Sequence, residues 1–148
     1  MTESEELYND MSALLKEIGL DLVDFVLSRH KGSTQVRAVV YRAGGTGIDE
    51  CSKAHRLIRA RLEERFGEPD VQLETASPGI DRVIAAAREY AVFKGRGVRL
   101  ILDTEEVVEG RIVSSDGMTV VIAGTDGEHA ISMERIRKGK LDYSQEGR

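Results

Sequence analysis

Residues 71–82 have the sequence VQLETASPGIDR, and this stretch divides the chain. Apolar and polar side chains alternate over residues 71–75, which predicts a short β-strand. Ser77-Pro78-Gly79 ends that pattern, because Pro followed by Gly at the central positions of a turn favours type II, in which Gly accepts a positive φ. The spacing of apolar residues differs before and after this turn, so two kinds of structure are expected.

The stretch before the turn predicts alternating helices and strands. Apolar residues recur at helical spacing over residues 3–18, which predicts an amphipathic helix. Residues 20–30 and 34–42 are rich in apolar and β-branched types and are joined tightly, which predicts an antiparallel hairpin. Asp49 is a good N-cap for a second helix. The predicted order is therefore helix, two strands, helix and strand.

The stretch after the turn predicts one helix and then only strands. Asp81 is expected to cap a helical segment over residues 83–93, and the glycines of 94–97 mark a boundary. Short β-type runs separated by turn residues then predict about five antiparallel strands, hence a small barrel. These runs are 98–103, 107–114, 118–123, 129–133 and a last strand that includes 140–142.

These elements predict an α+β protein of two domains. We expect an N-terminal α/β domain in residues 1–90 and a C-terminal β-barrel domain in residues 91–148. Residues 144–148 are expected to form a short, frayed polar tail.

The composition excludes several classes of protein. No apolar run approaches the ~20 residues that cross a bilayer, and the acidic N-terminal residues lack a signal-peptide pattern, so we expect a cytoplasmic protein. The single cysteine, Cys51, excludes an intrachain disulfide. The net charge of −5 argues against coating nucleic acid through bulk charge, but it permits a local basic patch and favours basic partners.

Three stretches together resemble the RimP family of ribosome maturation factors. They are the helix opening at Ile48-Asp49-Glu50-Cys51, the strand and turn of residues 71–82, and the ending ISMERIRKGKL of residues 131–141. Their order and spacing match the family over nearly the whole chain. The chain departs from the family pattern at Ala76, Ile80, Val83 and Gly139.

The resemblance implies an N-terminal α/β domain followed by an SH3-like β-barrel. It implies a factor that binds the small ribosomal subunit precursor during assembly, near a basic small-subunit ribosomal protein and the neighbouring rRNA. It implies no enzymatic activity, no cofactor and no metal, and we expect a monomer without a membrane partner. An RNA-binding module that is not tied to the ribosome is the alternative.

Nine charged residues are candidates for partner binding or for contacts between the domains. Arg82 suits a phosphate or carboxylate clamp through its bidentate geometry, but with Asp81 it is better interpreted as a cap and a salt bridge between the two domains. The other seven form the best cationic group of the chain, although strand alternation prevents all of them from sharing one face. The nine are Asp81, Arg82, Arg96, Arg99, Arg111, Arg135, Arg137, Lys138 and Lys140.

Two further motifs have a catalytic or ligand-binding interpretation that we do not favour. Cys51 and His55 are four residues apart on one helix and could form a nucleophile pair, but Cys51 lies on the apolar stripe and no second cysteine exists. The glycines of residues 44–47 precede a helix, as in phosphate-binding loops. Their motif is incomplete, so they are interpreted as a connector.

Overall fold

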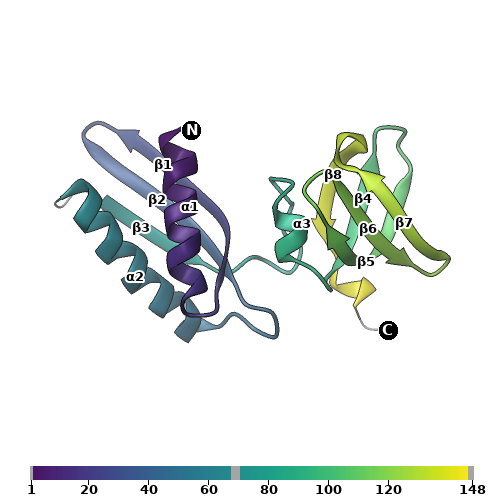
Figure 1. Ribbon diagram of the computed structural model, residues 1–148, viewed down its shortest axis with the longest axis horizontal. Helices are drawn as coiled ribbons and strands as arrows, with labels where there is room; N and C mark the ends of the chain where they lie inside the picture. The colour runs from purple at the N-terminus through teal and green to yellow at the C-terminus, as the bar shows by residue number, and fades with distance from the viewer. Residues whose placement is uncertain (1, 68–70, 147–148) are drawn as a thin grey trace. The chain divides into compact units, whose positions relative to one another are not determined.

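The computed structural model describes residues 2–67 and 71–146 (Figure 1). The chain forms two compact units, Met1–Pro78 and Gly79–Arg148. The division falls between Pro78 and Gly79. The predicted domain limits of 1–90 and 91–148 therefore differ from these units by the segment 79–90. Gly79 lacks the positive φ that a type II turn requires, so the predicted turn type was wrong.

The first unit has the predicted order of elements. Two helices and three strands follow one another as α1 (Glu3–Lys16), β1 (Asp21–His30), β2 (Ser33–Tyr41), α2 (Ile48–Phe66) and β3 (Val71–Ala76). β1 and β2 are antiparallel, as predicted, and β3 is parallel to β2. A parallel pair needs a long crossover connection, and α2 supplies it.

Each helix of this unit begins with a carboxylate that accepts a backbone N–H. Glu5 and Thr2 form a reciprocal capping box at α1, with a distance of 3.1 Å from Glu5 N to Thr2 Oγ1. At α2, the N–H of Gly47 donates to Glu50 Oε1 at 2.7 Å. Gly47 is therefore the N-cap and the prediction of Asp49 was wrong, because Asp49 already lies in the first helical turn.

Both helices bury one stripe against the same face of the sheet β1-β2-β3 (Figure 1). The stripe recurs every four residues, which keeps it on one side of each helix. At ~25 cal/mol per Å² of apolar surface, this shared face is the main stabilising feature of the unit. The fully buried members include Leu7, Met11 and Leu15 from α1 and Ala54, Ile58 and Leu62 from α2.

The second unit is built on an antiparallel sheet of five strands in the order β7-β6-β5-β4-β8. The five predicted strands are confirmed, and the described pairings leave β7 and β8 at the two edges. A closed SH3-like barrel therefore stays a prediction. The elements are α3 (Glu89–Val92), β4 (Gly97–Leu102), β5 (Val107–Ser115), β6 (Thr119–Gly124), β7 (Gly127–Ser132), the 3₁₀ turn η1 (Met133–Arg135), β8 (Ile136–Leu141) and the 3₁₀ turn η2 (Tyr143–Gln145).

The predicted helix over residues 83–93 was wrong, and only its end, α3, is helical. The N–H of Leu141 donates to the carbonyl of Arg82 at 2.9 Å, and the N–H of Ile84 donates to the carbonyl of Gly139 at 2.8 Å. These bonds hold residues 82–84 extended along β8, with Val83 opposite Lys140. Pairing with β8 overrides the helical propensity of the alanines that follow. Asp81 consequently caps no helix.

Gly139 allows the ring of Tyr90 to lie directly on β8. Tyr90 is 4% exposed, and burial, followed by the charge of Glu89, raises the pKa of its hydroxyl to about 12. A Cβ atom at position 139 would collide with that hydroxyl and would lie 3.1 Å from Cζ of Tyr90 and 3.2 Å from Cδ2 of Leu100. The departure at Gly139 thus has a packing explanation.

Gly139→Ala is expected to destabilise the second unit by ~1–3 kcal/mol, because the buried ring has no space to retreat. Tyr90→Phe removes the colliding oxygen, so the double variant should recover part of this loss. Urea unfolding of the full chain, followed by amide NMR signals of the second unit, measures both effects. Lys138→Ala, at an exposed position of the same strand, is the control. A loss that is purely additive in the double variant would contradict the proposed collision.

Candidate functional site

β8 exposes three cations along one short strand. Ile101 faces Lys138 whereas Leu102 faces Ile136, so Arg137 is the extra residue of a β-bulge. The bulge explains why Arg137 and Lys138 are both exposed although they are adjacent, and Lys140 follows on the exposed side. In the part of the chain that the structure describes, none of the three forms an ion pair.

Arg99 of β4 extends this group, because it lies directly opposite Lys140 in the antiparallel pair. Two like charges opposite each other in a sheet destabilise it. Arg99 is relieved only in part by Glu109, whose Oε2 is 3.8 Å from Arg99 Nε, and both side chains are 46% exposed. We call Arg99, Lys138 and Lys140 the cationic row. An anionic partner would remove the repulsion within it.

One end of the cationic row forms a wall of a pocket of about 330 Å³. Asp81, Arg99 and Lys140, three of the predicted site residues, line it together with Ile80, Asp142 and Tyr143. The hydroxyl of Ser144, then its backbone N–H and the positive charge of Arg99, lower the pKa of Asp142. Asp142 is therefore a carboxylate at neutral pH, and the pocket holds two positive and two negative charges.

Ile80 and Tyr143 are members of this pocket that the sequence analysis missed. Ile80 is 71% exposed and Tyr143 is 65% exposed. Large apolar side chains at such exposure within one hollow are a feature of binding surfaces. The available signal was the isolated tyrosine in an otherwise polar C-terminal segment.

Arg82 forms a structural ion pair with Glu89, and this pair lies within the second unit rather than between the two domains. Arg82 Nε donates to Oε1 of Glu89 at 2.8 Å, and the side chains are 12% and 0% exposed. The other oxygen of Glu89 accepts the N–H groups of Ala85 and Ala86, at 3.1 and 3.0 Å. A buried carboxylate is stable only with such partners. Arg82 thus fixes the segment that leads to β8.

Arg96 and Arg111 do not belong to the cationic row either, because both contact Glu146. Arg96 Nε donates to Oε2 of Glu146 at 2.7 Å, the N–H of Gly97 donates to the same oxygen at 2.9 Å, and Arg111 donates to the carbonyl of Glu146. The expectation of a frayed tail over 144–148 was therefore wrong for Ser144–Glu146. Residues 147–148 lie outside the described residues.

Arg135 belongs to a different cluster. Its guanidinium lies between two acids of the β4–β5 connection, with Nε 3.6 Å from Asp103 Oδ1 and Nη2 3.8 Å from Glu106 Oε1. The structure thus places Arg99, Lys138 and Lys140 together and leaves Arg137 beside them. Arg82, Arg96, Arg111 and Arg135 are each engaged with a carboxylate or a carbonyl.

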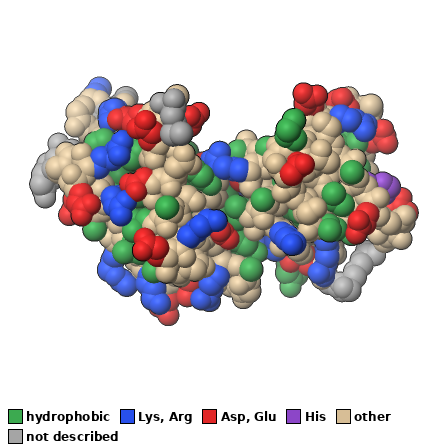
Figure 2. Space-filling model, in the orientation of Figure 1, with side chains coloured by type: hydrophobic (Ala, Val, Ile, Leu, Met, Phe, Trp, Pro, Cys, Tyr) green, Lys and Arg blue, Asp and Glu red, His purple; other side chains and the backbone are tan. Residues whose placement is uncertain are grey.

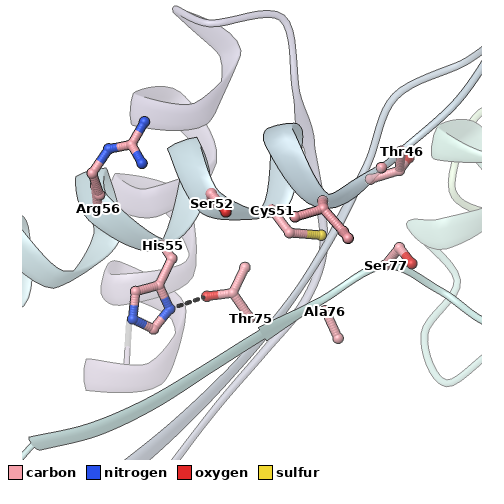
Figure 3. A pocket seen from close by; sticks show the side chains of 10 residues that line it. Thr46, Cys51, Ser52, His55, Arg56, Thr75, Ala76 and Ser77 are labelled. Carbon is pink, nitrogen blue, oxygen red and sulfur yellow. Dashed lines mark hydrogen bonds between the residues drawn. The ribbon is translucent and has the colours of Figure 1, made fainter.

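The first unit has its own hollow, of about 750 Å³, which contains Cys51 and His55 (Figure 3). The imidazole of His55 is turned toward Thr75, with Nδ1 3.1 Å from Thr75 Oγ1, and the sulfur of Cys51 points to the other end of the hollow. Burial, followed by the nearby charge of Glu50, raises the pKa of the Cys51 thiol. A catalytic pair needs the opposite shift and a shared hydrogen bond.

The glycine loop before α2 is likewise occupied by protein groups. The N–H of Arg42 donates to Thr46 Oγ1 at 2.8 Å, and Glu50 accepts the N–H of Gly47. That hydrogen bond lowers the pKa of Glu50, although partial burial opposes it, so a negative charge already stands at the start of the helix. A phosphate would be repelled there.

Charges of both signs are interspersed over the visible face of each unit (Figure 2). Within residues 2–67 and 71–146, no group of three or more His, Cys, Asp and Glu side chains is arranged to hold a metal ion. None of the helices in these ranges combines the length and hydrophobicity that a membrane span requires.

Fold and site together define a two-unit α+β protein whose second unit presents cations beside a small amphipathic pocket. Residues 11–81 match the family model of the RimP N-terminal domain. The chain is 29% identical to the ribosome maturation factor RimP of Borrelia garinii subsp. bavariensis, over 94% of this chain and 95% of the relative. It is 26% identical to the RimP protein of Borrelia hermsii, over 95% of this chain and 97% of the relative. Residues 11–81 thus carry a RimP N-terminal domain, and the chain is similar to ribosome maturation factors named RimP over nearly its whole length.

Arg82→Met is expected to destabilise the second unit by ~3–5 kcal/mol, because it leaves the carboxylate of Glu89 buried without its cation. Adding Glu89→Gln should restore part of the stability, since the amide still accepts a backbone N–H. Urea unfolding and hydrogen exchange at Ala85 and Ala86 measure the effect. Lys94→Met serves as the exposed control. Equal losses for Arg82→Met and Lys94→Met would refute the structural role.

Cys51 is expected to react with iodoacetamide more slowly at pH 7.5 than a free cysteine, because its raised pKa leaves less thiolate. The rate should increase with pH through the alkaline range, and it should approach the free value in urea. Mass spectrometry of the alkylated chain provides the rates. A folded-state rate above that of free cysteine would favour the nucleophile interpretation instead.

Proposed function

We propose that this protein acts in ribosome maturation by binding a precursor of the small ribosomal subunit, without bond-making chemistry. Its relatives in the family carry the name ribosome maturation factor. The supporting observation on the chain itself is the cationic row, which is concentrated on one strand pair of a protein with a net charge of −5. Concentrated cations within an acidic protein suit a local contact with phosphates rather than general nucleic-acid coating.

A second contact is proposed for a basic small-subunit ribosomal protein. The β4–β5 connection exposes Asp103, Glu105 and Glu106, and Arg135 neutralises them only in part. Acidic and cationic surfaces on the same unit match a partner that combines rRNA with a basic protein. Complementary charge of this kind mainly increases the association rate and the specificity.

We also propose the fold of the second unit, the extent of the domains and the oligomeric state. The second unit is an SH3-like barrel, in which the bulges of β5 and β8 supply the bending that closure requires. The domains correspond to the two compact units Met1–Pro78 and Gly79–Arg148, and the protein is a cytoplasmic monomer. Two linked units that both engage the precursor raise each other's effective concentration.

The mechanism is differential binding. The protein binds an intermediate conformation of the assembling subunit more tightly than the finished one, and so shifts the equilibrium between them. The shift cannot exceed the difference in binding free energy between the two states. No cofactor is required for such a role. A strain without the gene should accumulate precursor rRNA and free small subunits, and a normal subunit profile would oppose the proposal.

The triple variant Arg99→Gln, Lys138→Gln, Lys140→Gln is expected to bind small-subunit precursors more weakly and with less dependence on salt. The slope of log affinity against log salt should flatten by about one per lost phosphate contact. Its stability should be unchanged or higher, because the repulsion between Arg99 and Lys140 is relieved. Sucrose-gradient sedimentation across salt concentrations and urea unfolding provide the two measurements.

Lys16→Gln, Lys53→Gln, Lys94→Gln is the matched control, because it removes the same charge from exposed positions outside the row. Equal weakening by both triple variants would mean that total charge, not the row, governs binding. If the protein were instead an RNA-binding module that acts outside the ribosome, the wild type and both triple variants would all stay at the top of the gradient.

A further inference from the structure

We propose that the pocket beside the cationic row binds one unpaired nucleotide of RNA, with the base on the ring of Tyr143 and the phosphate on Arg99 and Lys140. This inference deepens the proposed function by naming the chemistry of the RNA contact. It depends on that function only for the source of the RNA.

Tyr143 supplies the stacking surface. Its side chain is 65% exposed. Tyr143 is the first residue of η2, and hydrogen bonds to Asp142 order the turn that begins there. The N–H and hydroxyl of Ser144 donate to Asp142 Oδ1 at 3.0 and 2.6 Å, which holds the turn that carries the ring. An exposed aromatic ring on an ordered turn offers a base a stacking surface without first ordering the backbone. Ile80, on the same pocket, adds apolar surface.

The charges of the pocket distinguish a nucleotide from a simple anion. Arg99 and Lys140 attract a phosphate, whereas Asp81 and Asp142 repel any small anion that enters. A nucleotide satisfies both pairs, because its phosphate is anionic and its base edge carries N–H donors for carboxylates. Lys138, on the same side of the sheet two residues from Lys140, can receive the next phosphate along the strand.

The dimensions favour a single, unstacked nucleotide. The volume of about 330 Å³ is at the small end of ligand pockets. Bases of an RNA duplex are stacked and paired, and side chains cannot enter their deep groove. Recognition of a base on an exposed aromatic ring therefore requires a loop, a bulge or a single-stranded end, which precursor rRNA presents before it is fully folded.

The test measures binding of the full chain to fluorescently labelled RNA hexanucleotides by anisotropy, with a duplex of the same sequence in parallel. The wild-type protein should prefer the single strand. Tyr143→Ala should weaken that binding about ten-fold or more, since a stacked base contributes substantially to affinity. Tyr143→Phe should retain binding. Met118→Ala is the control, because Met118 is 77% exposed and lies outside the pocket.

Three results would overturn the inference. They are unchanged single-strand affinity of Tyr143→Ala, equal weakening by Met118→Ala, and a duplex bound as tightly as the single strand. In the first case, if Tyr143→Ala also lost affinity for a basic peptide, the pocket would be assigned to a protein partner instead.

Sedimentation separates this inference from the proposed function. A wild-type protein that binds single-stranded RNA through Tyr143, but never sediments with small subunits, would support the pocket and refute the ribosomal role. A protein that sediments with small subunits equally well with and without Tyr143, and whose hexanucleotide affinity is also unchanged, would refute only the pocket.

Discussion

The carboxylate of Glu89 is the group on which the second unit depends. It is fully buried and charged, and it is satisfied by the guanidinium of Arg82 and two backbone N–H groups. A buried charge is tolerated only when its partners are in place, so the segment around it has little freedom. That segment then runs along β8 and carries Ile80 and Asp81 to the pocket. The buried Arg82–Glu89 ion pair thereby helps to position Ile80 and Asp81, which are exposed.

The arginines and lysines of the second unit divide into two populations with different physical roles. Arg82, Arg96 and Arg111 are held by carboxylates or carbonyls that organise the chain, and Arg135 links η1 to an acidic connection. The cationic row has no comparable function in stability, since two of its members repel each other across the sheet. Because the cationic row costs stability in the free protein, its charges are best explained by contact with a partner. We therefore assign the row to binding.

The first unit shows a contrasting use of charge. Its α1 acids face arginines from neighbouring elements, as in the pairs Glu3–Arg29, Glu6–Arg65 and Asp10–Arg61. Glu3–Arg29 and Glu6–Arg65 are exposed, so each adds little to stability, whereas the side chains of Arg61 and Asp10 are only 34% and 31% exposed. The three pairs engage Arg29, Arg61 and Arg65, three of the ten Lys and Arg residues at positions 1–78. The hollow with Cys51 and His55 is likewise arranged for structure, because the histidine is bound to Thr75.

The sequence by itself determined the order of helices and strands, because hydrophobic periodicity and turn residues act locally. It also identified the family, through the 71–82 and 131–141 stretches, and it selected Arg99 and Lys140 as candidates. It failed for residues 83–93, where local propensity is helical but hydrogen bonds to β8 are available only in the folded chain. It also left Tyr143 unnoticed and grouped seven cations that separate in space. Only the tertiary structure decided which charges are neutralised, because ion pairing such as Arg96–Glu146 joins residues 50 positions apart.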